Sequence, residues 1–132
     1  MSESLEQLAR TAVDCGYRLH EALGPGLLES VYEACLFHDL THRGLRVERQ
    51  KRIPIRYGSV LIEEGFRADL LVEGQLLIEL KSTEKHAPVH AKQVITSLRL
   101  MDLPLGLLMN FGAPTFKEGV RRLANNYYRR SG

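Results

Sequence analysis

The stretch "DLLVEGQLLIELKSTEK" at residues 69–85 determines how the rest of the sequence is interpreted. Its two apolar runs, separated by a Glu-Gly pair, predict two strands joined by a short turn. Charges are rare in such apolar strands, because a charge removed from water is costly unless it is paired. Asp69, Glu79 and Lys81 nevertheless stand inside the stretch. These three residues are therefore candidates for a functional site.

Length and composition fit one globular domain over residues 1–132, with 44% hydrophobic and 26% charged residues. No apolar run approaches the roughly 20 residues that cross a membrane, and the polar start lacks the core of a signal peptide. We therefore expect a cytoplasmic protein without a membrane partner. Cys15 and Cys35 fall at apolar helical positions, which favours reduced thiols over a disulfide. The net charge of +2 does not mark a dedicated nucleic-acid binder.

Hydrophobic periodicity predicts elements in the order α-α-β-β-β-α-β-α. The expected helices cover residues 3–23, about 27–43, about 88–101 and about 115–129, and the strands cover 45–57, 60–72, 75–81 and 103–111. Within the second strand, "EEG" at 63–65 indicates a bulge or break. A three-stranded meander, followed by a helical crossover to a buried strand, predicts an α/β fold with a mixed β-sheet flanked by helices.

The length of the turn after residue 72 decides whether Asp69 and Glu79 meet. A two-residue loop would pair Asp69 with Ile78, so that Asp69 would point away from Glu79. A three-residue loop would place the two carboxylates directly opposite each other, where they repel unless a cation lies between them. Periodicity alone leaves both registers open. A shared metal favours the three-residue loop.

Two helices carry further candidates. Glu29 and Glu33 lie four residues apart on the second helix, so they share one face. We expect Glu33 on an exposed edge, whereas Glu29 either interacts with the helix dipole or belongs to the site. On the helix over 88–101, Gln93 and Ser97 form a polar stripe beside the apolar one, and they can face the same cleft.

These residues carry a resemblance. "GLLESVY" at 26–32 matches the G-x-x-E-x-x-Y signature and resembles the GxxExxY protein family, a branch of the PD-(D/E)xK nuclease superfamily with the restriction-endonuclease-like fold. The similarity continues through the segments "RADLLV", "IELKSTEK", "HAKQV" and "LGLLMNFG" and covers about residues 20–112. D-x9-E-x-K alone is a weak motif. The full set, in the same order and on matching elements, is specific for the fold: Glu29, Asp69, Glu79, Lys81 and Gln93.

The resemblance implies a magnesium site. Asp69 and Glu79 would ligate Mg²⁺, with the Leu80 backbone carbonyl as a third ligand and Mn²⁺ as a substitute metal. Glu29 would act as an additional acidic residue at the metal or its waters. Hard oxygen ligands of this kind are those that Mg²⁺ prefers.

The resemblance also implies catalytic and substrate-positioning roles. Lys81 would orient or activate water and stabilise charge on the phosphorus centre, and Gln93 would position the substrate. Ser97 departs from the Q-x-x-x-Y pattern of related exonuclease-like members, so stacking or hydrogen bonding by a tyrosine is not expected at this position.

The sequence therefore predicts a Mg²⁺-dependent nuclease acting on nucleic acid. Two alternatives stay open: a non-catalytic nucleic-acid-binding module, and a protein-interaction domain whose acidic residues hold a structural cation. An inactive descendant would often lose Lys81 or Glu79, and this chain keeps both. A homodimer is expected if the protein cuts both strands of a duplex.

Overall fold

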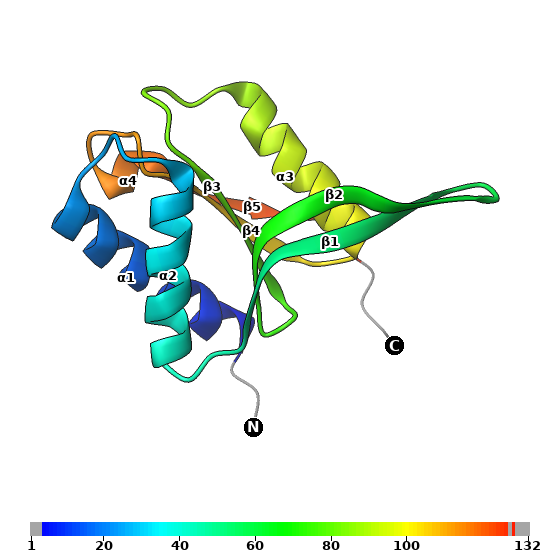
Figure 1. Ribbon diagram of the computed structural model, residues 1–132, viewed down its shortest axis with the longest axis horizontal. Coiled ribbons are helices and arrows are strands. Elements are labelled where there is room, and N and C mark those ends of the chain that lie inside the picture. The colour runs from blue at the N-terminus through cyan, green and yellow to red at the C-terminus, as the bar shows by residue number, and fades with distance from the viewer. Residues whose placement is uncertain (1–3, 127, 129–132) are drawn as a thin grey trace.

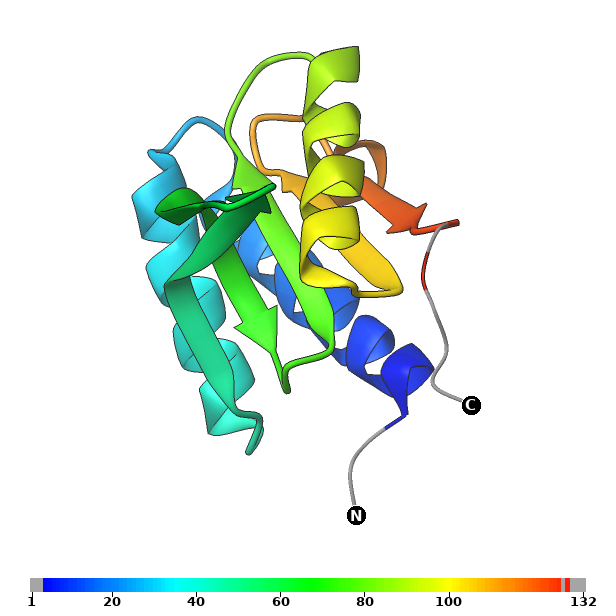
Figure 2. The ribbon, with the colours of Figure 1, turned by 90° about the vertical axis from the view of Figure 1, so that its right-hand side faces the viewer.

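One five-stranded sheet separates two helical layers. The computed structural model describes residues 4–126 and residue 128. The helices are α1 (Leu5–Leu23), α2 (Glu29–His42), α3 (Pro88–Met101) and α4 (Phe116–Gly119), and the strands are β1 (Val47–Tyr57), β2 (Val60–Val72), β3 (Leu76–Lys81), β4 (Leu105–Asn110) and β5 (Val120–Ala124). The strand order is β1-β2-β3-β4-β5, and only β3 and β4 run parallel. Helices α1 and α2 cover one face and α3 covers the other (Figures 1 and 2).

The predicted mixed sheet and its order of elements are confirmed, and β5 follows that order as an additional strand. The helix expected over residues 115–129 was wrong beyond Gly119, where the chain turns into β5 and pairs with β4; residues 127 and 129 lie outside the described part. Val120 and Leu123, three apart, mimic a helical stripe. On a strand they face opposite sides, and each packs against a different hydrophobic core. Pairing with the buried β4 therefore overrides the helical periodicity.

Strands β1 and β2 form a hairpin whose outer part, residues 53–66, projects from the sheet; we call this part the arm (Figure 1). The bulge or break expected at 63–65 is a bulge in one continuous strand, where the pairing shifts register between Ile53 and Ile55. A Cβ on Gly65 would lie 2.3 Å from Ile55 Cγ1, so this position excludes a side chain. The bulge redirects the two strands away from the sheet.

Separate hydrophobic cores fill the two faces of the sheet. The larger core joins α1 and α2 to the sheet, and the smaller one lies under α3; its buried members are Ile53, Ala68, Leu77, Val94, Leu98 and Leu108. Cys15 and Cys35 are free, as expected. Among the described residues, none of the helices is both long and apolar enough to cross a membrane.

Gly112 provides a test of the packing behind the end of β3. A Cβ at Gly112 would lie 2.2 Å from the backbone oxygen of Thr83, which cannot move without shifting the loop after β3. We predict that Gly112→Ala lowers the free energy of unfolding by about 2–3 kcal/mol in chemical denaturation. At Gly106 the closest atoms are methyl groups of Val94 and Leu98, at 3.0 and 3.3 Å. Gly106→Ala should therefore cost clearly less, and equal losses would contradict this packing.

Candidate active site

The turn between β2 and β3 places the two central carboxylates opposite each other. The pairs Leu70–Ile78 and Val72–Leu76 fix the register, so the loop consists of the three residues 73–75. The three-residue loop is thus confirmed, and the same register brings Asp69 opposite Glu79. Glu73 and Gly74 adopt left-handed φ angles of 53° and 65°, which close the turn.

Asp69 is held by the backbone of β3. Its Oδ2 accepts a hydrogen bond from Leu80 N–H at 2.8 Å, just beyond the last backbone pair, Leu70–Ile78. In a strand, the N–H and C=O of one residue point to the same side. The Leu80 carbonyl therefore also points toward β2, on the edge where Asp69 lies. Two carboxylates and one backbone carbonyl thus gather where β2 leaves β3.

The environment of Glu79 disfavours its ionised form. Burial, then the negative charge of Asp69 and a hydrogen bond with that carboxyl group, together raise the pKa of Glu79 to about 9, while Lys81 acts in the opposite direction. At neutral pH the Glu79 carboxyl therefore holds a proton when no metal is bound. A cation between the two carboxylates would reverse this preference.

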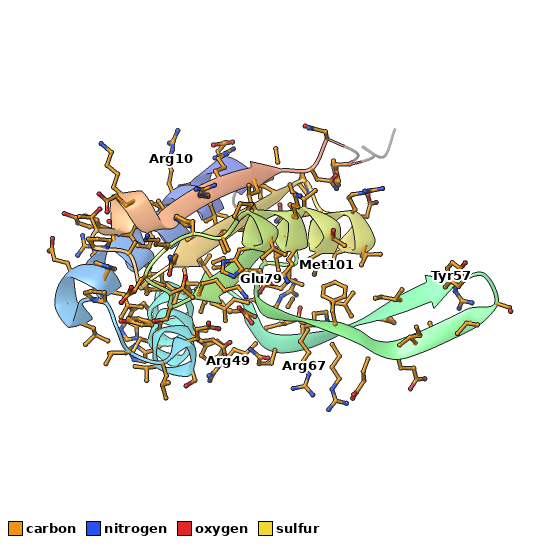
Figure 3. The ribbon with its side chains drawn as sticks, turned by 90° about the horizontal axis from the view of Figure 1, so that it is seen from above. Arg10, Arg49, Tyr57, Arg67, Glu79 and Met101 are labelled. Atoms are coloured by element: carbon orange, nitrogen blue, oxygen red, sulfur yellow. The ribbon has the colours of Figure 1, made fainter. Side chains whose placement is uncertain are left out.

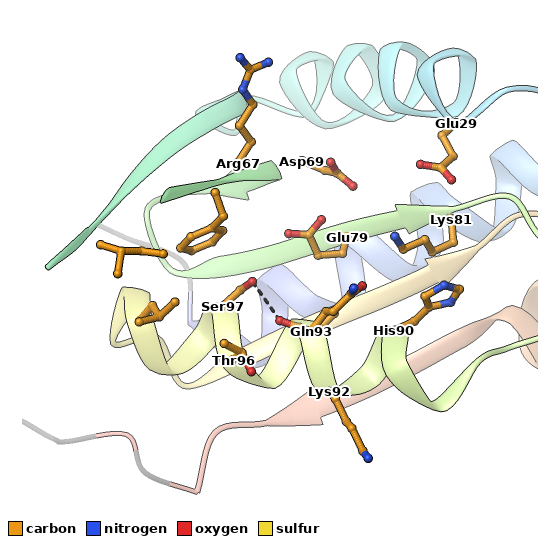
Figure 4. A pocket seen from close by; sticks show the side chains of 14 residues that line it. Glu29, Arg67, Asp69, Glu79, Lys81, His90, Lys92, Gln93, Thr96 and Ser97 are labelled. Carbon is orange, nitrogen blue, oxygen red and sulfur yellow. Dashed lines mark hydrogen bonds between the residues drawn. The ribbon is translucent and has the colours of Figure 1, made fainter. Parts of the chain in front are cut away.

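A cavity of about 550 Å³ surrounds the two carboxylates. It is lined by the side chains of Glu29, Asp69, Glu79, Lys81 and Gln93, which come from four different elements (Figure 4). Glu29 points from the first turn of α2 toward Lys81, opposite the residues of α3 (Figure 4). The five predicted side chains thus meet in one cavity, and their roles remain predictions.

Tyr32 fixes the loop that carries Glu29. Its ring is fully buried, and its O–H donates to the Gly24 carbonyl at 2.5 Å while accepting from Leu27 N–H at 3.2 Å. The Leu27 carbonyl in turn accepts from Ser82 Oγ at 2.6 Å, directly after β3. The tyrosine of the G-x-x-E-x-x-Y pattern therefore has a structural function: it holds Glu29 beside the end of β3.

The expectation of an exposed Glu33 was wrong. Glu33 is only 8% exposed, since Arg49 and Gln50 of β1 cover it. Its Oε1 accepts from Gln50 Nε2 at 2.5 Å, and its Oε2 accepts from Arg49 Nη2 at 3.3 Å. Gln50 Nε2 also lies 3.3 Å from Asp69 Oδ1, so this network reaches the cavity. Glu33 precedes Leu36 and Leu40 by three and seven residues, which places it on the buried face of α2, and this spacing is the signal that could have indicated its burial.

Ser97 stands at the position of the tyrosine in the Q-x-x-x-Y pattern, but its side chain makes a contact within its own helix. Its Oγ donates to the Gln93 carbonyl at 3.0 Å, one turn back on the same helix (Figure 4). A tyrosine at this position would extend several ångströms further from the helix. The cavity therefore keeps open space beside Gln93.

The donor set fits a metal that retains part of its water shell. Within residues 4–126 and 128, no three Asp, Glu, His or Cys side chains form a group able to hold a metal by themselves. Asp69, Glu79 and the Leu80 carbonyl supply three oxygen donors, and Mg²⁺ characteristically keeps several waters. Glu29 is consistent with a contact through such a water.

We predict that the metal-free protein loses stability as the pH rises from about 4.5 toward about 9. Glu79 ionises near 4.5 when unfolded but near 9 when folded, so the folded state binds more protons in this range. The free energy of unfolding therefore falls with pH across the window. Chemical denaturation in chelator should show a flatter profile for Glu79→Gln, with a gain of about 1–2 kcal/mol at neutral pH.

The control for this pH profile is Glu84→Gln, at an exposed position outside the cavity. It should follow the wild-type profile. If the stability of Glu79→Gln changed with pH in parallel with that of the wild type, the ionised form of Glu79 would not be destabilised in the folded protein.

Comparison with known proteins agrees with this geometry. A model of the PD-(D/E)XK nuclease superfamily matches residues 6–123. No curated protein and no solved structure gave a significant match. The matched region contains the whole cavity and every strand except the last residue of β5. The chain therefore belongs to the PD-(D/E)XK nuclease superfamily.

Proposed function

We propose that the protein is a Mg²⁺-dependent nuclease that hydrolyses phosphodiester bonds, with Mn²⁺ as a substitute metal. The observation that carries the proposal is the pair Asp69 and Glu79, which face each other at the edge that also presents the Leu80 carbonyl. An apolar sheet gains no stability from a buried carboxylate with a raised pKa. The arrangement becomes favourable when a cation is shared. The similarity to the GxxExxY family supports the same assignment.

Each residue has a role that follows from its position. Asp69, Glu79 and the Leu80 carbonyl would hold the metal, which would polarise the phosphate and lower the pKa of a bound water. The Lys81 ammonium would orient the attacking water and offset charge on the phosphate oxygens. Glu29, facing Lys81, would hold water from the opposite wall, and the Gln93 amide would donate to the substrate.

His90 lines the same end of the cavity as Lys81. Burial, followed by the positive charge of Lys81, lowers its pKa. We therefore assign the role of charged donor at that end to Lys81 rather than to His90.

We predict cleavage of a mixed panel of DNA and RNA, single- and double-stranded, in Mg²⁺ or Mn²⁺ but not in chelator. Lys81→Ala should reduce the cleavage rate at least about 100-fold, because it removes a preorganised charge from the reaction centre. The matched control is Lys85→Ala, which removes an exposed lysine of the following loop outside the cavity and should retain the activity.

The same panel separates the alternatives. Salt-sensitive binding without cleavage in either metal would identify a non-catalytic nucleic-acid-binding module. Absence of both binding and cleavage would favour a protein-interaction domain. Equal rates for Lys81→Ala and Lys85→Ala would remove Lys81 from the reaction.

A further inference from the structure

The cavity has two chemically different ends. Glu29, Lys81 and His90 line one end, near the start of α3, whereas apolar side chains of the arm and the later turns of α3 line the other: Ile55, Phe66, Val94 and Leu100. His90 and Leu100 are ten residues apart on α3, which corresponds to about 15 Å along a helix. The two carboxylates lie between the ends. Figure 3 shows Glu79 between α3 and the base of the arm.

The apolar end is close to the carboxylates and continuous with them. Phe66 precedes Asp69 by three positions on β2, which corresponds to about 10 Å along a strand. Leu100 remains 46% exposed although its side chain borders the cavity. A ligand held at the carboxylates can therefore reach apolar surface without leaving the cavity.

Gln93 stands at the boundary between the two ends (Figure 4). Its side-chain amide has no hydrogen-bond partner among the described residues, so both its donor and its acceptor are available to a ligand. Ser97, one turn further, keeps lone pairs on an Oγ that already donates to the helix. These groups can bond to the polar edge of a flat ring whose faces contact hydrocarbon.

We infer that the apolar end binds the base of a nucleotide next to the scissile phosphate, and that the substrate is an unpaired nucleic-acid strand. The inference rests on the proposed function, which places the phosphate at Asp69 and Glu79. In a nucleic acid only the base offers an uncharged flat face, since the phosphate is anionic and the sugar is polar. A base inside a duplex is stacked and paired, so only an unpaired strand presents that face freely.

The matched test compares two leucines of nearly equal exposure. Leu100 borders the cavity, and Leu61, near the tip of the arm, is 48% exposed and lies outside it. Affinity for a fluorescent single-stranded oligonucleotide is measured by anisotropy in Ca²⁺, which takes the same oxygen ligands as Mg²⁺. Leu100→Ala and Phe66→Leu should weaken binding about tenfold, the scale of one lost base contact. Leu61→Ala should bind as the wild type does.

A duplex of the same sequence supplies the second comparison. The wild type should bind the single strand at least about tenfold more tightly than the duplex, and Leu100→Ala should leave the duplex affinity unchanged. Equal losses for Leu100→Ala and Leu61→Ala, or a duplex bound as tightly as the single strand, would overturn the subsite. Thermal melts identify any variant that is not folded. Because Leu100 is exposed, Leu100→Ala should stay folded, and its affinity for the single strand then decides whether the subsite exists.

Cleavage of the single strand in Mg²⁺ tests the proposed function separately. Cleavage by the wild type, with Leu100→Ala binding like Leu61→Ala, would keep the nuclease and remove the base subsite. Selective loss of binding by Leu100→Ala, without cleavage by any form, would keep the subsite and remove the nuclease.

Discussion

The hydrogen bond from Leu80 N–H to Asp69 Oδ2, at 2.8 Å, stands where a backbone pair between β2 and β3 would otherwise continue. Because a side chain satisfies this N–H, β2 can leave β3 without exposing an unpaired buried donor. The same departure leaves the Leu80 carbonyl facing Asp69 and opens the cavity beside α3, and further along β2 the bulge directs the arm out of the sheet. The geometry of the site thus depends on one side chain.

A network behind the cavity holds this aspartate in place. Gln50 bridges the buried Glu33 and Asp69, and Arg49 compensates the charge of Glu33. Gln50 has a positive φ of 48°, which is unfavourable for a residue other than glycine. Local strain, a buried carboxylate on α2 and a raised pKa at Glu79 therefore converge on the same few residues. Such a concentration of unfavourable features is characteristic of a functional site.

The order of elements and the two possible registers of the central hairpin could be predicted from the sequence, because both follow from the alternation of apolar residues and from the length of the turn. It could not choose between the registers, since that depends on the left-handed conformations of Glu73 and Gly74. The strand β5 was missed because spacing by three at Val120 and Leu123 serves a helix, or a strand with a core on each face, equally well. That Arg49 and Gln50 are the partners of Glu33 depends on packing between α2 and β1, which leaves no local pattern in the sequence.

Calorimetric titration with Mg²⁺, in two buffers of different ionisation enthalpy, tests most directly whether Asp69 and Glu79 form a metal site. Since Glu79 is protonated in the metal-free protein at neutral pH, a bound cation must displace that proton. Binding to the wild type should therefore release about one proton per Mg²⁺ near pH 7.5, and Glu79→Gln should not bind. Unchanged Mg²⁺ binding by Glu79→Gln, or no binding by the wild type, would contradict the shared-metal account.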